Sequence, residues 1–180
     1  MGIDAKQFIL GRCGTYVDLQ ILMFNQDDPT KCTAAKLVKF GMARQVRKTS
    51  QKSVVLNPFS EEYILKPDCA NMNSITAIDC SWELAQKMFF KRFTGMSRKL
   101  PPLLAGNPVN YSKTGKLTTA EAIAGTLYII GLDNLANSIL NKFKWGHTFY
   151  DLNQDLLMDY SKASQHEDII QIAKDYGLIV

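Results

Sequence analysis

Residues 98–131 read RKLPPLLAGNPVNYSKTGKLTTAEAIAGTLYIIG, which we interpret as a loop that runs directly into a helix. The three prolines of this stretch fix φ and lack a backbone N–H, so no helix is expected to begin before them. Thr118 and Glu121 have the S/T-x-x-E spacing of a capping box, and an apolar helical pattern follows. The stretch therefore predicts a capped helix that starts close to Thr118.

One side of this predicted helix is thin, because Ala120, Ala124 and Gly125 have little or no side chain. A neighbouring segment could therefore approach the helix closely. The loop before it offers backbone N–H and C=O groups beside the positive end of a helix, which suits a polar ligand. An ordinary connection in an α/β protein would use the same residue types, and the spacing alone leaves both interpretations open.

Outward from this stretch, short strand-like runs alternate with helical patterns. Strands are expected at 16–25, 53–56 and 75–80, and helices at 33–38, 82–93, 134–143, 144–163 and 167–176. Thr33 is a candidate N-cap of the first helix. The 144–163 pattern places Trp145, Phe149, Leu152 and Leu156 on one buried face. The alternation predicts an α/β domain with a largely parallel sheet.

Polar residues follow the predicted strands at Asp27, Asp28, Asn57 and Asp79. In open parallel sheets, ligands bind at the carboxyl ends of the strands. Asp79 and the nearby Trp82 could together hold a ribose and a flat or cationic group. The alternative is that Asp79 caps a helix or a turn, and that Trp82 is a core residue like most large aromatics.

The charge is unevenly distributed along the 180 residues, which carry a net charge of +4. Residues 1–52 contain nine Lys and Arg against four acids, and residues 87–116 contain seven basic residues and no acid. Residues 145–180 reverse this pattern, with six acids and two lysines. A basic region of this kind indicates a polyanion such as nucleic acid as partner, unless the bias belongs to an ordinary solvated surface.

Several functional classes are disfavoured by the sequence. The four cysteines are far apart and form no CxxC pair, so we expect no metal site and free thiols in a reducing compartment. No apolar run is long enough to span a membrane and the first residues lack a signal-peptide layout, so the expected location is cytoplasmic. Only two histidines occur, and nucleotide-binding or hydrolase motifs are missing. Any chemistry would depend on positioning more than on proton relay.

Five segments resemble the small-subunit ribosomal RNA aminocarboxypropyltransferases, in the same order and over nearly the whole chain after Val17. They are DDPTKCTA (27–34), VLNPFSEEYILKPD (55–68), IDCSW (78–82), the stretch 98–131 and FKWGHTFYDLNQDLLMDY (143–160). The segments DCSW and LPPLLAGNPVNY are the most specific. Ser112 and Thr114 depart from the family pattern, which has Gly and Pro at these positions, so the loop could differ in rigidity.

The resemblance implies a SPOUT-like fold, in which a mostly parallel sheet is flanked by helices and the C-terminal half contains a trefoil knot. A small N-terminal α/β part, residues 1–70, would precede a SAM-binding part, residues 71–180. It also implies transfer of the 3-amino-3-carboxypropyl (acp) group of S-adenosylmethionine (SAM) to N3 of a uridine or (N1-methyl)pseudouridine in small-subunit rRNA, with methylthioadenosine as the product. The expected partner is rRNA or a pre-ribosomal particle, and the expected state is a monomer.

Carried over by position, the resemblance also implies site residues. Asp79 would act as a base or, as we favour, as a cofactor anchor, and Trp82 with Ala85 would enclose the SAM methyl group. The further cofactor positions are Thr33, Leu56, Leu100, Leu103, Leu104, Tyr111 and Thr119. From the charge pattern we expect phosphate contacts at Arg44, Arg47, Lys48, Arg98, Lys99 and Lys116. The alternatives are a SPOUT-class RNA methyltransferase and a non-catalytic rRNA-binding assembly factor.

Overall fold

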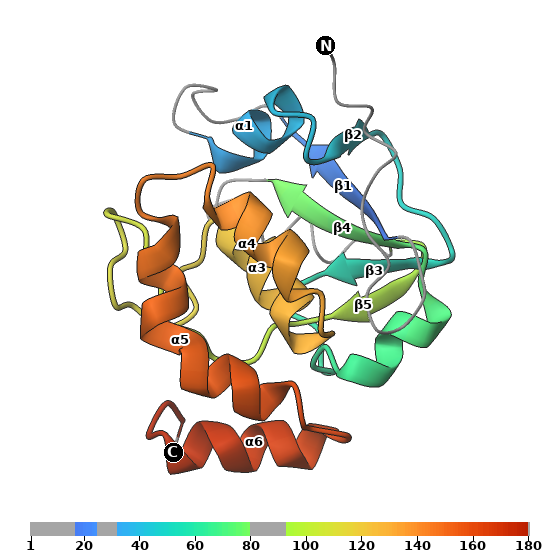
Figure 1. The fold of residues 1–180 in the computed structure, drawn as a ribbon. Helices are drawn as coiled ribbons and strands as arrows, with labels where there is room; N and C mark the ends of the chain where they lie inside the picture. Colours follow the sequence, from blue (N-terminus) through green and yellow to red (C-terminus); the bar gives the residue numbers. More distant parts are fainter. Residues whose placement is uncertain (1–16, 25–31, 80–92, 180) are drawn as a thin grey trace.

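A computed structural model describes residues 17–24, 32–79 and 93–179, and it has the predicted α/β architecture (Figure 1). Its strands are β1 (Asp18–Met23), β2 (Arg44–Val46), β3 (Ser53–Leu56), β4 (Ser74–Asp79) and β5 (Met96–Arg98). Its helices are α1 (Thr33–Lys39), α3 (Thr119–Ile129), α4 (Asp133–Leu140), α5 (Gly146–Tyr160) and α6 (His166–Asp175), with a 3₁₀ helix, η1, at Lys66–Asn71.

The five strands form one sheet in the order β2-β1-β4-β3-β5, and every neighbouring pair is parallel. The predicted parallel sheet is therefore confirmed. Strand β4 lies between β1 and β3, although it follows both in the sequence. Strands β1, β2 and β3 precede the predicted boundary at residue 70, and β4 and β5 follow it, yet all five belong to one sheet. The division into two parts stays a prediction.

The two faces of the sheet differ in polarity because side chains alternate along each strand. Leu19, Ile21, Val54, Leu56, Ile75 and Ala77 form one face and belong to the hydrophobic core. On the other face, buried polar side chains bond to one another across three strands. The Ser53 and Thr76 hydroxyls are 2.6 Å apart, and the Thr76 hydroxyl donates to Gln20 at 3.2 Å. A buried polar group is costly unless it is paired, and these three pair with each other.

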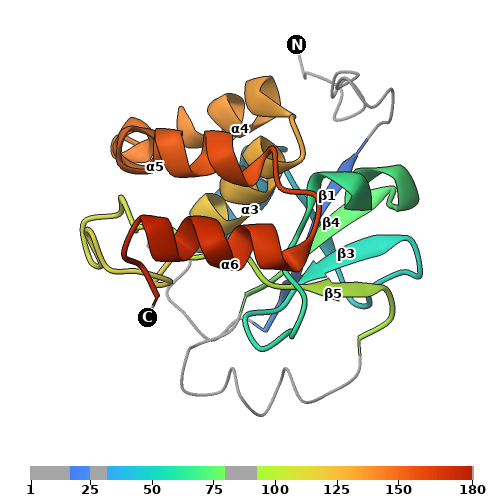
Figure 2. The same ribbon diagram turned by 90° about the horizontal axis from the view of Figure 1, so that it is seen from below.

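Helix α3 is the central helix, since it contacts β4, α1, α4 and α5 (Figures 1 and 2). Nine of its eleven residues are buried. Its thin side receives the preceding loop as predicted, because a Cβ placed on Gly125 would lie 3.0 Å from Leu103 and 3.1 Å from Leu100. Helix α6 packs on α5 at the outer end of the helical layer (Figure 2).

The sequence predicted most elements close to their observed bounds, including β3 at 53–56. Strands β2 and β5 were missed, because three-residue edge strands carry little periodic signal. The N-cap of α1 is Cys32 and not Thr33, since the Cys32 Sγ accepts the Ala35 N–H at 3.4 Å. Residues 82–92 of the predicted helix 82–93, and the residues Asp27 and Asp28, lie outside the described residues.

No helix among the described residues is both long and apolar enough to cross a bilayer.

Candidate functional site

Asp79 ends β4 at the carboxyl edge of the sheet, where it pairs with Met23, the last residue of β1. From β1 the chain continues to β2 on one side, whereas the next described strand after β4 is β5, beyond β3 on the other side. The β1/β4 boundary is therefore a point where the direction of the connections reverses. Ligands of open parallel sheets bind in the crevice at such a point.

The Asp79 carboxylate accepts hydrogen bonds from side chains of two other segments. The Cys32 thiol donates to Oδ2 at 3.3 Å, and the Thr119 hydroxyl donates to Oδ1 at 3.2 Å. Thr119 is the first residue of α3, so the carboxylate lies at the positive end of the central helix. These contacts hold the Asp79 carboxylate in one orientation, as a binding anchor requires.

Cys32 is half-buried beside this carboxylate. Burial raises the pKa of its thiol above the ordinary value, and the negative charge of Asp79 raises it further, although the Ala35 N–H acts in the opposite direction. The thiol is therefore held protonated, as its role of donor to Asp79 requires.

Thr33 joins the same group. Its hydroxyl oxygen accepts the backbone N–H of Ala120 at 3.3 Å, which ties the start of α1 to the start of α3. The structure thus brings together three predicted residues, Thr33, Asp79 and Thr119, from parts of the chain up to 86 residues apart, as well as Cys32, which was not predicted.

The loop between β5 and α3 is anchored by a carboxylate inside the protein. Glu121 is fully buried, and besides closing the predicted capping box with Thr118 it accepts the backbone N–H groups of Gly106 at 2.7 Å and Asn107 at 3.0 Å. Its Oε2 accepts the Asn107 amide at 2.9 Å and the Thr118 N–H at 2.7 Å. A buried carboxylate is tolerated only with such donors, and here they hold the loop in one conformation.

Helix α5 holds the other side of the loop. The buried Asn153 side chain accepts the Leu104 N–H and donates to the Leu104 carbonyl, both at 2.8 Å, which replaces the pairing a strand would provide. The Tyr160 hydroxyl donates to the Pro102 carbonyl at 3.1 Å. Gly106 lies against the backbone of Phe149, and a Cβ there would overlap it. The sequence indicated a loop here but not these long-range contacts.

The remaining predicted cofactor positions occupy different surroundings. Leu56 and Leu103 are buried core residues, whereas Leu100 and Leu104 are half-buried. The Tyr111 side chain is 58% exposed at the far end of the loop. Trp82 and Ala85 lie outside the described residues, so their assignment stays a prediction.

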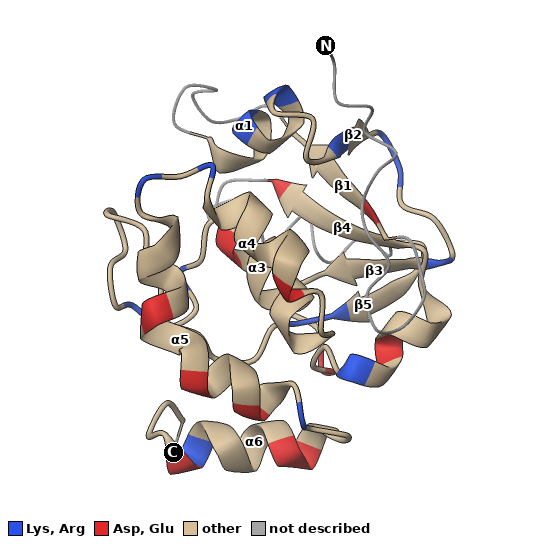
Figure 3. Ribbon diagram, in the orientation of Figure 1, with Lys and Arg blue, Asp and Glu red and all other residues tan. Residues whose placement is uncertain are grey.

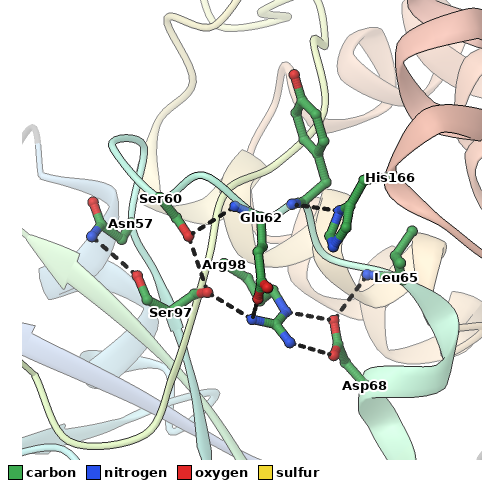
Figure 4. A network of polar contacts seen from close by, with 9 residues as sticks. Asn57, Ser60, Glu62, Leu65, Asp68, Ser97, Arg98 and His166 are labelled. Carbon is green, nitrogen blue, oxygen red and sulfur yellow. Dashed lines mark hydrogen bonds and ion pairs between the residues drawn. The ribbon is translucent and has the colours of Figure 1, made fainter.

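Arg98, predicted to contact phosphate, is held by two acids (Figure 4). Its guanidinium donates to both oxygens of Asp68, at 3.0 and 3.1 Å, and pairs with Glu62. Only 17% of its side chain is exposed. In this network Arg98 connects β5 to the segment 60–68, so the geometry favours a structural role and its RNA contact stays a prediction.

The other predicted RNA contacts are more accessible. Arg47, Lys48 and Lys116 are exposed. Arg44 is exposed too and pairs with Asp18 at 2.7 Å, while the Lys99 ammonium lies 4.4 Å from the centre of the Tyr63 ring. Basic residues occur around α1, β2 and the loops, whereas acidic residues gather on α5 and α6 (Figure 3). The predicted segregation of charge is therefore visible in the fold.

Within the described ranges, no group of three or more His, Cys, Asp or Glu residues is arranged to hold a metal ion.

Two family descriptions match the chain. Residues 54–177 match "Ribosome biogenesis protein, C-terminal", and residues 17–51 match "Possible Fer4-like domain in RNase L inhibitor, RLI". A four-iron cluster is held by cysteine thiolates, and residues 17–51 contain only Cys32, so this segment lacks the ligands for such a cluster.

Curated relatives agree with the first of these matches. The 16S rRNA aminocarboxypropyltransferase of Methanococcoides burtonii is 42% identical over 88% of this chain and 94% of its own length. That of Sulfurisphaera tokodaii is 40% identical over 86% of this chain and 92% of its own.

A solved structure, the SAM-dependent rRNA:acp-transferase Tsr3 from Vulcanisaeta distributa, superposes with a TM-score of 0.81 and 33% identity. The match covers 94% of this chain and 91% of that one. Identity of this extent over nearly the full length, together with the shared fold, assigns the chain to a family: it belongs to the 16S rRNA aminocarboxypropyltransferases.

Proposed function

We propose that this protein transfers the acp group of SAM to N3 of a uridine, a pseudouridine or an N1-methylpseudouridine in small-subunit rRNA, and that methylthioadenosine is released. The observation that carries the proposal is the Asp79 carboxylate, oriented by Cys32 and Thr119 where the sheet's connections reverse. Family membership and the structural match to a SAM-dependent rRNA:acp-transferase support SAM as the donor.

The residues around Asp79 fit a cofactor with hydroxyl and ammonium groups. Each oxygen of Asp79 accepts at least one hydrogen bond from the protein, which orients the carboxylate, and a carboxylate has about four acceptor positions. We assign Asp79 to anchoring such a donor group, while Thr33 fixes the relative position of α1 and α3. In this role Asp79 binds and orients, and it does not remove the proton from the acceptor base.

When bound, SAM supplies a sulfonium with three electrophilic carbons, and the carbon that faces the nucleophile reacts. The chain's task is therefore to present one carbon and to protect the others. We assign protection of the methyl group to Trp82 and Ala85, because an aromatic face favours a sulfonium charge. In the proposed transfer the N3 proton would pass to solvent. A bond would form between N3 and the acp carbon that is bonded to sulfur, and the electron pair of the broken carbon–sulfur bond would stay on the sulfur of methylthioadenosine.

The proposal extends to features that the resemblance implies. We propose a SPOUT-like trefoil knot in the C-terminal half, which an experimental structure that traces the complete chain would test. Knots are rare, so such a trace could readily contradict it. We also propose that the protein is a monomer in the cytoplasm, to be checked by its mass in solution and by cell fractionation.

The decisive experiment uses SAM labelled either in the methyl group or in the carboxyl carbon, with small-subunit RNA that is unmodified at N3. The proposal requires carboxyl label in the RNA and methyl label in methylthioadenosine. Methyl label in the RNA, with S-adenosylhomocysteine as by-product, would instead identify a methyltransferase. RNA that is bound but acquires neither label would favour the non-catalytic assembly factor.

A further inference from the structure

The segment 107–116, which we name the finger, exposes apolar and aromatic side chains although its backbone is firmly held. Val109 is 82% exposed and Tyr111 is 58% exposed. In Figures 1 and 2 the finger is the yellow loop that projects from the molecule beside α5. Exposed aromatic groups on an ordered loop are typical of a contact surface.

Backbone hydrogen bonds connect the finger to residues 103–105, which precede it in the same loop. The Ser112 N–H donates to the Ala105 carbonyl at 2.7 Å, and the Ala105 N–H donates to the Lys113 carbonyl at 3.1 Å. The Gly115 N–H donates to the Leu103 carbonyl at 3.0 Å. Together with the buried Glu121 at its base, these bonds hold the finger in place before any partner binds. A pre-ordered loop loses little conformational entropy on binding.

The charge of the finger indicates the kind of partner. From residue 93 to residue 117 the sequence contains four basic residues and no acid. Lys113 and Lys116 are exposed and lie two and five residues after Tyr111 in the sequence, and Lys113 takes part in none of the ion pairs found among the described residues. Lysines beside an exposed aromatic ring suit a nucleic acid strand, because the ring can stack on a base while an ammonium contacts phosphate.

The finger also adjoins the site. It ends two residues before Thr118, and Thr119 donates to Asp79. An RNA strand lying on the finger would therefore pass close to the start of α3.

We propose that the finger holds unpaired nucleotides of the acceptor RNA, with the Tyr111 ring stacked on a base and the Lys113 ammonium on a phosphate. This inference rests on the proposed function, which supplies RNA as the substrate. It goes further because it assigns the Tyr111 side chain to a contact with RNA and not with the cofactor. Stacking requires bases that are free of a duplex, so the finger selects single-stranded or loop nucleotides.

The test compares Tyr111→Ala with Tyr111→Phe, which keeps the ring, and with Tyr176→Ala as control. Tyr176 is similarly exposed, at 44%, but lies at the end of the acidic helix α6. The probes are a fluorescent single-stranded uridine oligomer and a duplex of the same length. Loss of one stacked base should weaken binding of the single strand roughly tenfold in Tyr111→Ala. Tyr111→Phe and Tyr176→Ala should bind as the wild type does, and duplex binding should not change.

Charge supplies a second readout. Lys113→Gln should reduce the slope of log affinity against log salt by about 0.7 for the single strand. SAM affinity, measured by calorimetry, should be unchanged in all these variants, whereas the apparent KM for RNA should rise in Tyr111→Ala.

Wild-type affinity of Tyr111→Ala for the single strand would overturn the inference. A loss of SAM affinity in Tyr111→Ala would also overturn it, because the Tyr111 side chain would then belong to the cofactor pocket. So would a variant that binds the RNA oligomer normally but no longer binds a protein of a pre-ribosomal particle. The binding assay does not depend on group transfer. If the wild type binds RNA through the finger but transfers no acp group, the proposed function fails and the inference stands.

Discussion

At the scale of single residues, the site depends on one carboxylate and the side chains that orient it. Asp79 receives a thiol from the start of α1 and a hydroxyl from the start of α3. Because these donors come from different elements, the position of the carboxylate reports on the packing of both helices.

Asp79→Asn keeps the size of the side chain and removes its charge. If Asp79 anchors SAM, affinity should fall about tenfold or more, since a hydrogen bond to a charged group contributes roughly 1.5–3 kcal/mol. Calorimetry measures this directly, and turnover at saturating SAM should be affected much less. Normal affinity with collapsed turnover would instead identify Asp79 as the base that takes the N3 proton.

Cys32→Val removes the thiol donor with little change in volume, whereas Cys32→Ser keeps a donor. We expect several-fold weaker SAM binding in the valine variant and near wild-type binding in the serine variant. Both variants should be compared by thermal unfolding, because valine also removes the N-cap contact to Ala35. Equal SAM affinity in the two would show that the thiol does not position Asp79.

The pH dependence of alkylation checks the state of this thiol independently. The pKa of Cys32 is raised, so its reactive thiolate should appear only at a pH above the usual range for cysteine. Iodoacetamide labelling of the Cys32 peptide, followed by mass spectrometry over a pH series, should therefore lag behind labelling in the unfolded chain. Equal rates at every pH would contradict the burial of the thiol.

At the scale of elements, the loop before α3 has a backbone fixed by hydrogen bonds, as a strand has, although it contains almost no regular structure. Glu121 and Asn153 satisfy its backbone from α3 and α5, so the loop behaves as part of the core.

Glu121→Ala should remove this anchoring. The variant leaves two backbone N–H groups of the loop, at Gly106 and Asn107, without their partner in a buried site. We expect the free energy of unfolding to fall by about 3 kcal/mol or more, since each unsatisfied buried donor costs roughly 1–3 kcal/mol. Urea denaturation measures the change. Thr118→Ala, which removes only the cap, is the control and should lose about 1 kcal/mol.

Ser112 provides a smaller test within the finger. It is the one described non-glycine residue with positive φ, at 62°. A left-handed backbone conformation costs a non-glycine residue roughly 1–2 kcal/mol, and glycine relieves this strain. Part of the gain is offset, because glycine raises the conformational entropy of the unfolded chain. Ser112→Gly should therefore stabilise the protein by about 0.5 kcal/mol in urea denaturation. Ser112→Ala should not stabilise the protein. If the alanine variant gained as much free energy of unfolding as the glycine variant, the left-handed backbone at residue 112 would not be strained.

At the scale of the whole molecule, opposite charges occupy different parts of the fold (Figure 3). Basic residues surround α1 and β2 and line the loop before α3, while α5 and α6 together carry six acids and one lysine. An RNA strand would be attracted to the first region and repelled by the second, which gives the molecule a preferred orientation on its substrate.

The double variant Arg47→Glu/Lys48→Glu tests this orientation. Both side chains are exposed after β2 and neither belongs to the predicted cofactor positions, so RNA affinity should fall without loss of SAM affinity. Each phosphate contact that is lost should reduce the salt slope by roughly 0.7 to 0.9. Lys174→Glu on α6 is the control and should bind RNA normally. Wild-type binding by the double variant would remove this region from the RNA surface.

Elements whose signals are local could be predicted from the order of the amino acids alone. The capping box of Thr118 and Glu121, the strand 53–56 and the thin side of α3 were predicted, because caps, β-branched runs and small residues act within a few residues of one another. The alternation of strands and helices was likewise enough for an α/β class with a parallel sheet. Asp79 was a candidate because it ends a predicted strand, and the family resemblance added Thr33 and Thr119 as site residues.

Contacts between groups that are distant in the sequence became known from the fold and not from local patterns. Cys32 and Asp79 are 47 positions apart, and Asn153 bonds to a loop residue 49 positions away. Arg98 pairs with Asp68 and Glu62, because the packing of β5 beside the 60–68 segment brings acids to it. A side chain's partners depend on how strands are ordered and helices packed. No local pattern encodes that order, so the charge pattern did not reveal these acidic partners, and the predicted phosphate contact of Arg98 stays a prediction.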